Sequence, residues 1–218
     1  MKKGIVWFRN NLRLADNESL KRALDECDEV LCVYFLEPRT WNSVAEPSRM
    51  GSIRAKFILE SLLELEGDIQ ELGGTMEFIQ GRAVDEIPRI LQSYGADRCY
   101  AQKEDAWWET EQEHLLADQI NLILSGGRGI WEESDLPFAL NDLPAVFSSF
   151  RRKVEKKMQI RSLFPPPRSM ACSWETKTEL PTLTSLGFEE YSTDERAVLD
   201  FRGGAKEAKK WMHQWIWE

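Results

Sequence analysis

The sequence predicts an α/β fold with a doubly wound, five-stranded parallel sheet flanked by helices, followed by a C-terminal linker and a terminal helix. Short runs rich in Val, Ile, Tyr, Phe and Cys recur along the first part of the chain, and amphipathic helical patterns separate them. Because strands alternate with helices, we expect right-handed crossovers and helices on both faces, an arrangement of the Rossmann-like type. The strands are expected at residues 4–8, 29–35, 75–80, 98–101 and 129–132.

The first predicted strand, residues 4–8, ends in a loop that carries Arg9 and Arg13. Its apolar residues are typical of a parallel strand that is buried on both faces. Asp16 or Asn17 then offers an N-cap for the first helix. A strand, a basic loop and a capped helix form half of an α/β unit, and ligands of such sheets lie at the carboxyl ends of the strands.

Three further helices are expected between the later strands. The clearest covers residues 52–72, where apolar side chains form a single stripe and two glycines end the helix. A second helix is expected at 83–94 and a third at 105–124, again closed by two glycines. The residues expected to face the core from the third helix are Leu116, Ile120, Ile123 and Leu124.

The pattern changes near Pro137. An amphipathic helix with a basic polar face is expected at 142–158, and the Phe-Pro-Pro-Pro-Arg run at 164–168 should be extended, because proline does not continue a helix. Residues 169–202 are mostly polar and predict a long linker, and residues 205–217 predict a last helix with a tryptophan-rich face. The chain thus divides into an α/β domain over 1–135, a helical and proline-rich extension over 136–168, and a linker with a terminal helix over 169–218.

Composition and motifs narrow the classes of function. The 218 residues carry a net charge of −9, which argues against a general nucleic-acid-binding surface, because such surfaces are normally basic. The four cysteines lack metal-site spacing and indicate reduced thiols in a cytoplasmic protein. No apolar run approaches the roughly 20 residues of a membrane-spanning helix, and the N-terminal lysines lead directly into a strand, so we expect neither a membrane span nor a signal peptide. No Walker A loop, GxSxG or HExxH motif supports a kinase or a hydrolase.

Several segments resemble the DNA photolyase/cryptochrome family. That family opens with Trp-Phe-Arg, Asp-Leu-Arg and Asp-Asn, and this chain has Trp-Phe-Arg at 7–9, Asn-Leu-Arg at 11–13 and Asp-Asn at 16–17. Asn11 therefore stands where the family has Asp. Two longer matches are Phe-Leu-Glu-Pro-Arg at 35–39 and Gly-Ser-Ile-Arg-Ala-Lys-Phe-Ile-Leu-Glu-Ser-Leu at 51–62.

The resemblance extends to the DASH-type cryptochromes. Ala-Gln-Lys-Glu at 101–104 is similar to the His-Lys-Glu or His-Arg-Glu segment that follows their fourth strand. Phe-Arg-Gly-Gly-Ala at 201–205 resembles the segment that leads into their helical FAD-binding domain, although the family has Glu where this chain has Ala205. The resemblance covers nearly the whole chain but less than half of a full-length photolyase.

The resemblance implies an N-terminal antenna-chromophore-binding domain of a photolyase or DASH-type cryptochrome, whose parent activity is light-driven repair of pyrimidine dimers in DNA. In the family, FAD and the lesion pocket belong to the helical domain. We therefore expect this chain neither to bind FAD nor to be catalytic alone, and to contact DNA only within the full-length protein. The implied antenna is methenyltetrahydrofolate at a partial site. There, Glu104 is implied to accept hydrogen bonds from the pterin ring, with Lys103 and Gln102 beside it.

Each of these roles has an alternative. Glu104 also suits the first turn of a helix, where the helix dipole favours a carboxylate. Arg9 and Arg13 are expected to pair with internal acids such as Asp16 rather than to line an anionic pocket, and the basic face at 151–157 is either solvated or a phosphate contact. For the whole chain, the alternative is a free-standing nucleotide-binding, pterin-binding or protein-interaction module of the same fold. The tryptophan face of the last helix also predicts weak self-association.

Overall fold

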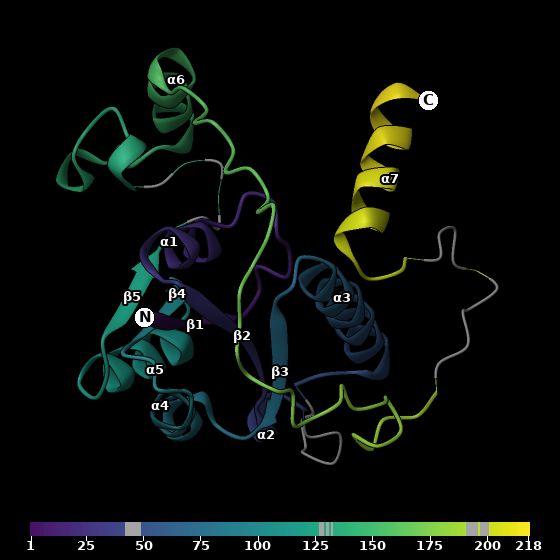
Figure 1. Ribbon diagram of the computed structural model, residues 1–218. Helices are drawn as coiled ribbons and strands as arrows, with labels where there is room; N and C mark the ends of the chain where they lie inside the picture. The colour runs from purple at the N-terminus through teal and green to yellow at the C-terminus, as the bar shows by residue number, and fades with distance from the viewer. Residues whose placement is uncertain (42–48, 127–128, 130, 132, 191–195, 197–200) are drawn as a thin grey trace.

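A computed structural model describes residues 1–41, 49–126, 129, 131, 133–190, 196 and 201–218. The centre of this part of the chain is a sheet of five parallel strands in the order β3-β2-β1-β4-β5 (Figure 1). The strands are β1 (Lys3–Phe8), β2 (Glu29–Leu36), β3 (Thr75–Gln80), β4 (Arg98–Gln102) and β5 (Leu122–Ser125). The predicted α/β fold with a five-stranded, doubly wound parallel sheet is confirmed.

Helices cover both faces of the sheet (Figure 1). The helices are α1 (Glu18–Glu26), α2 (Pro38–Trp41), α3 (Ser52–Glu71), α4 (Ala83–Tyr94), α5 (Trp107–Ala117), α6 (Phe147–Lys157) and α7 (Ala205–Trp217), with 3-10 turns at Glu133–Asp135 and Leu140–Asp142. Alternate residues of β1 lie in two separate hydrophobic cores, one on each face of the sheet. Val6 and Phe8 pack with α1 and α3, whereas Ile5 and Trp7 pack with α4 and α5.

The start of α1 shows which of the two candidate caps acts. The Oδ1 atom of Asn17 accepts a hydrogen bond from the N–H of Leu20 at 3.2 Å, so Asn17 is the N-cap. Asp16 precedes it in a left-handed conformation, with φ of 49°. Its N–H donates to the carbonyl oxygen of Phe164 at 2.8 Å, which ties the proline-rich segment to the loop after β1.

The position of the fifth strand and the extent of the third predicted helix were wrong. α5 ends at Ala117, and β5 lies at Leu122–Ser125 and pairs with β4. The apolar residues at 120–124 fit both a helical and an extended period, and pairing with the edge of β4 decides between them. Of the range 129–132 predicted as a strand, residues 130 and 132 lie outside the described residues.

The helix predicted at 142–158 is shorter in the structure. α6 begins at Phe147, while residues 140–142 form a 3-10 turn. Pro144 lies between the two elements, and a residue that precedes proline is biased away from the α conformation. The other expected helices match closely, at Ser52–Glu71, Ala83–Tyr94 and Ala205–Trp217.

The first part of the predicted linker, residues 170–188, lies against the α/β unit without forming helix or strand. Met170 and Phe188 are buried in the core beside β2 and α3. Glu77 on the edge strand β3 is buried and accepts hydrogen bonds from the indole N–H of Trp174 at 2.9 Å and from the hydroxyl of Thr178 at 2.9 Å. This segment therefore covers the otherwise open edge of β3.

α7 is attached to the α/β unit at its N-terminal end. The N–H of Gly203 donates to Glu60 Oε2 at 2.8 Å, and that of Gly204 donates to Ser61 Oγ at 3.0 Å. A Cβ atom on Gly203 would lie 2.0 Å from the carbonyl oxygen of Phe57, so this close approach requires glycine. Beyond the joint, α7 points away from the sheet (Figure 1), and none of its residues is buried.

Two further expectations concern membranes and cysteines. Within the described residues, no helix combines the length and the apolar content that a bilayer crossing requires. Cys27, Cys32, Cys99 and Cys172 are all free thiols, and burial raises the pKa of Cys99 to about 12. In the same part of the chain, no group of three or more His, Cys, Asp or Glu side chains is arranged to hold a metal ion.

Candidate functional site

The carboxyl ends of β1, β2 and β4 lie together at one edge of the sheet. The strand order reverses between β1 and β4, and crevices at such switch points are where open α/β sheets bind ligands. Three connections meet there: the loop after β1, the turn into α2 after β2, and the loop that leads from β4 into α5. The candidate site is built from these connections and from the N-terminal part of α3.

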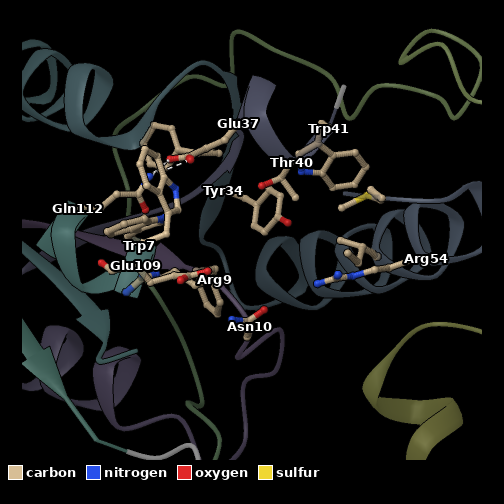
Figure 2. A pocket seen from close by; sticks show the side chains of 15 residues that line it. Trp7, Arg9, Asn10, Tyr34, Glu37, Thr40, Trp41, Arg54, Glu109 and Gln112 are labelled. Carbon is tan, nitrogen blue, oxygen red and sulfur yellow. Dashed lines mark hydrogen bonds between the residues drawn. The ribbon is translucent and has the colours of Figure 1, made fainter. Parts of the chain in front are cut away.

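A cavity of about 140 Å³ opens between these elements (Figure 2). Six aromatic residues line it: Trp7, Phe8, Tyr34, Phe35, Trp41 and Trp108. Trp41 meets Tyr34 edge to face at 6.4 Å between ring centroids, and the Arg39 guanidinium lies 3.6 Å from the ring centroid of Trp108. Such rings present flat, apolar surfaces that suit a planar aromatic ligand.

Two of the charged groups near the cavity are held by the protein itself. Arg9 forms a buried ion pair with Glu113 of α5, stacks 4.4 Å from the ring centroid of Trp7, and donates to the Gln102 carbonyl oxygen at 3.2 Å. Glu37 accepts from the amide of Gln112 at 2.8 Å and from the N–H at the start of α4 at 2.9 Å. These two side chains stiffen the walls of the cavity rather than offer a charge to a ligand.

Arg54 of α3 differs from Arg9 and Glu37 in its interactions. It lines the cavity, and in Figure 2 its guanidinium reaches from the α3 side toward the space beside Tyr34 and Asn10. Among the described residues, no acidic side chain forms an ion pair with Arg54. An arginine at the edge of an aromatic cavity is suited to hold a phosphate or a carboxylate.

The hydroxyl group of Tyr34 is a donor at neutral pH. Burial raises the pKa of Tyr34 to about 12, although the nearby Arg54 and Trp41 act in the opposite direction. The tyrosine therefore stays protonated and neutral over the physiological range. It offers a hydrogen bond at the point where the aromatic wall meets the cation.

A second cavity, of about 520 Å³, continues from the first toward α7. The two cavities share Arg9, Asn10, Tyr34, Arg54 and Ile58. The second is the more apolar, with Phe57 of α3 and Met212 of α7 among its lining residues, and Lys209 of α7 adds another cation. We call the two cavities together the carboxyl-end groove. It runs from Trp108 past Tyr34 and Arg54 to the inner side of α7.

None of the three site residues predicted from the sequence lines this groove. Glu104 is 1% exposed, and its Oε1 atom accepts a 2.8 Å hydrogen bond from Nδ2 of Asn10. Gln102 is buried at the end of β4, whereas the side chain of Lys103 is exposed. The structure thus places Glu104 directly behind Asn10, which lines both cavities.

The two arginines of the first loop have the structural roles that were expected, with one change of partner. Arg13 lies 3.8 Å from the Asp16 carboxylate and also donates to the carbonyl oxygens of Ala15 and Asp16. Arg9 pairs with Glu113 instead of with an acid in its own loop. Asn11 is buried, and its Oδ1 atom accepts from the N–H of Arg9 at 3.1 Å, so the amide stabilises the loop without a charge.

Sequence reasoning did not identify Arg54, Tyr34 and Trp108 as site residues. Tyr34 lies near the end of a predicted strand, and the rule that ligands bind at carboxyl ends could have found it. Arg54 lies in the segment 51–62 that resembles the family, but a residue on a helix gives no sign that it faces the sheet edge. Trp108 lies in the first turn of the helix expected at 105–124, where only residues of the apolar C-terminal half were expected to face the core.

The comparison with known proteins decides the family. The sequence model described as DNA photolyase matches residues 4–170, which is most of the chain. This chain belongs to the DNA photolyase family. The sheet, the groove and the loop motifs described above are therefore those of a photolyase-family α/β domain.

Individual relatives agree with this assignment. The Cryptochrome DASH of Natronomonas pharaonis is 31% identical over 228 residues, which cover 100% of this chain and 48% of that protein. The Cryptochrome DASH of Synechocystis sp. is 31% identical over 220 residues, covering 98% of this chain and 45% of the relative. The chain thus spans about half the length of the curated relatives it matches.

Solved structures give the same picture. The cryptochrome of Synechocystis sp. superposes with a TM-score of 0.90 at 30% identity, over 100% of this chain and 46% of the other. An archaeal photolyase from Sulfolobus tokodaii, whose structure contains two FAD molecules, has a TM-score of 0.72 at 22% identity. The second comparison supports the fold alone.

Proposed function

We propose that this chain is the antenna-chromophore-binding domain of a longer, DASH-type photolyase or cryptochrome. The observation that carries the proposal is the carboxyl-end groove, where aromatic residues meet Arg54, which has no ion pair with an acid among the described residues, at the switch point of the sheet. An antenna pigment is a planar conjugated ring, and the groove offers flat walls for a ring and a cation for an acidic tail. Light-driven repair of pyrimidine dimers would belong to the longer protein, with reduced FAD in its helical domain.

The pigment that we propose is methenyltetrahydrofolate. Its pterin ring would lie in the smaller cavity, near Tyr34, and its glutamate carboxylate would pair with Arg54 or Lys209 in the larger one. The smaller cavity, of about 140 Å³, suits a ring system and not a whole cofactor, so the ligand would need both cavities. A flavin is the second choice, because it also combines a planar ring with an anionic tail.

The proposed role of Glu104 follows from its place behind Asn10. A pterin would reach the Glu104 carboxylate only if the Asn10 side chain swung away, because that carboxylate is 1% exposed and already accepts a hydrogen bond from Asn10. We therefore infer that Glu104 orients Asn10, and that Asn10 touches the chromophore. Direct contact of Glu104 with the pterin, flanked by Gln102 and Lys103, is the alternative.

The longer protein would supply the partner of this domain. Met212, Trp215 and Trp217 are exposed on α7, with Trp215 88% exposed, and the larger cavity lies at the inner side of that helix. Exposed apolar patches of this kind mark interaction surfaces. We propose that a helical FAD-binding domain covers α7 in the longer protein, and that α7 supports weak self-association in this chain.

A titration of the purified chain with methenyltetrahydrofolate, followed by pigment absorbance and fluorescence, tests the proposal. We expect one saturable site whose affinity falls about tenfold or more in Arg54→Ala, because a charge-assisted hydrogen bond is worth roughly 1.5–3 kcal/mol. Lys56→Ala is the matched control, since Lys56 lies on the same helix and pairs with Glu60 at 3.9 Å instead of lining the groove. If adenine nucleotides bind at this site and the folate does not, the chain is a free-standing nucleotide-binding module and the proposal is wrong.

A further inference from the structure

The start of α7 is capped by side chains of a different helix. α7 follows Gly203 and Gly204, which have no side chain that could cap it. Glu60 of α3 accepts from the N–H of Gly203 at 2.8 Å, and Glu64 of the same helix accepts from the N–H of Lys206 at 2.9 Å. α3 thus supplies acceptors for N–H groups that the beginning of a helix otherwise leaves without partners.

These acceptors are charged and regularly spaced. Glu60, Glu64 and Asp68 recur every four residues, so they lie along one face of α3. The ammonium group of Lys206 donates to Oδ1 of Asp68 at 2.5 Å, and carboxylates beside the first turn of a helix interact favourably with its dipole. A Cβ atom on Gly204 would lie 2.5 Å from Oε2 of Glu64, so the second glycine allows the carboxylate to approach the helix this closely.

α7 also forms one wall of the larger cavity of the carboxyl-end groove. None of its residues is buried, so burial of apolar side chains does little to fix the angle at which the helix leaves α3. The polar contacts at its first turn therefore determine where this wall lies. Four residues that are three or four positions apart, and hence share one face of α7, line the cavity: Ala205, Ala208, Lys209 and Met212.

We propose that Glu60 and Glu64 are positioning residues of the carboxyl-end groove, which hold α7 at the angle that places Lys209 in the larger cavity. Neither carboxylate lines the groove, so neither would touch the chromophore. Both act through the N–H groups of α7, and Lys209 then meets the acidic tail of the ligand. Where it concerns the ligand, this inference rests on the proposed function, whereas the attachment of α7 to α3 can be measured without a ligand.

Hydrogen exchange of the ligand-free chain, followed by mass spectrometry, tests the attachment of α7. In Glu60→Ala/Glu64→Ala, the amides of residues 203–212 should exchange about fivefold or more faster than in the wild type, because the loss of one cap weakens a helix start by about this factor. Glu60→Gln/Glu64→Gln keeps the side-chain oxygen acceptors and should restore much of the protection. In the control Glu66→Ala, which removes an α3 carboxylate that accepts from Gln70 instead of from α7, exchange should match the wild type. Unchanged exchange at 203–212 in the double alanine variant would overturn the proposal.

A mutant cycle with Lys209 tests the link from this attachment to the groove. Lys209→Ala and Glu60→Ala/Glu64→Ala should each weaken methenyltetrahydrofolate binding by about tenfold. The triple variant should bind no more weakly than Glu60→Ala/Glu64→Ala, because Lys209 acts only where α7 is held, and additive losses would overturn the proposal. The thermal melt should stay the same in all variants, since no residue of α7 is buried. If the wild type binds no folate, the proposed function is wrong, and the exchange of α7 alone then decides whether the two carboxylates hold the helix.

Discussion

The Nδ2 atom of Asn10 donates a 2.8 Å hydrogen bond to Oε1 of Glu104 at the point where the strand order of the sheet reverses. Asn10 follows β1 and lines the carboxyl-end groove, and Glu104 follows β4 and is buried behind it. Glu104, which was expected to touch a chromophore, therefore contacts Asn10, and it is Asn10 that lines the groove. This hydrogen bond changes the effect that a mutation of Glu104 should have on chromophore binding.

A double-mutant cycle on this pair distinguishes positioning from direct contact. Glu104→Gln and Asn10→Ala should each weaken methenyltetrahydrofolate binding, and the double variant should bind no more weakly than Asn10→Ala alone, because Glu104 acts through Asn10. The measurement is the Kd of all four proteins by fluorescence titration. Additive losses would show that Glu104 contacts the pigment itself.

The ion pair between Arg9 and Glu113 should be the most costly pair to break. Both side chains are buried, at 6% and 3% exposure, and Glu113 also accepts from the N–H of Glu104 at 2.9 Å. Glu113→Ala leaves a buried guanidinium unpaired and should lower the free energy of unfolding by about 3–5 kcal/mol. Urea denaturation measures the loss. In the control Asp25→Ala, which breaks the exposed pair with Lys21, the change should stay below about 1 kcal/mol. Equal effects in the two variants would count against this assignment.

Glu29 should make the chain less stable in acid. The hydroxyl of Ser173 and the ammonium group of Lys3 lower the pKa of the Glu29 carboxyl below its ordinary value. Its stabilising contribution is therefore complete above the unfolded-state value of about 4.3 and is lost as the pH falls through the lower folded-state value. Urea midpoints between neutral pH and pH 3 should decline less steeply in Glu29→Gln than in the wild type. Parallel curves for the two proteins would contradict the prediction.

Two truncations test which C-terminal segments belong to the fold. A chain that ends at Arg202 lacks α7, none of whose residues is buried, and it should keep nearly the full melting temperature and associate less in light scattering. A chain that ends at Arg168 loses the buried Met170 and Phe188 and leaves Glu77 without the donors Trp174 and Thr178. Removing one such apolar side chain alone costs about 2–5 kcal/mol, so this shorter chain should be strongly destabilised or unfolded. If the two truncated chains melt alike, the segment after Arg168 does not stabilise the α/β unit.

Periodicity and capping rules predicted most of the fold, because they act within a few residues. The stripe on α3 and the glycine that ends α4 in a left-handed conformation, with φ of 73°, are features of local sequence. The fifth strand was misplaced because residues 120–124 satisfy two periods at once. Only the hydrogen bonds to β4, a strand about 20 residues earlier, determine that these residues form a strand instead of a helix.

The site was harder to predict because its parts come from distant segments. The resemblance pointed to Glu104, and the structure places that residue next to the groove, but sequence does not show that Asn10 covers its carboxylate. Arg54 reaches the groove only because α3 passes the ends of β1 and β2, which is a property of packing. Whether a cation is free or paired depends on the residues around it in space, and this is why Arg9 and Arg54 could not be told apart in sequence.

The most direct test of the central claim is a crystal structure of this chain with methenyltetrahydrofolate. The account predicts the pterin ring in the smaller cavity beside Tyr34, the Asn10 side chain against the ring, and a carboxylate of the tail within hydrogen-bond distance of Arg54. A pigment bound elsewhere on the domain, or a pterin ring on the Glu104 carboxylate with Asn10 displaced, would contradict it.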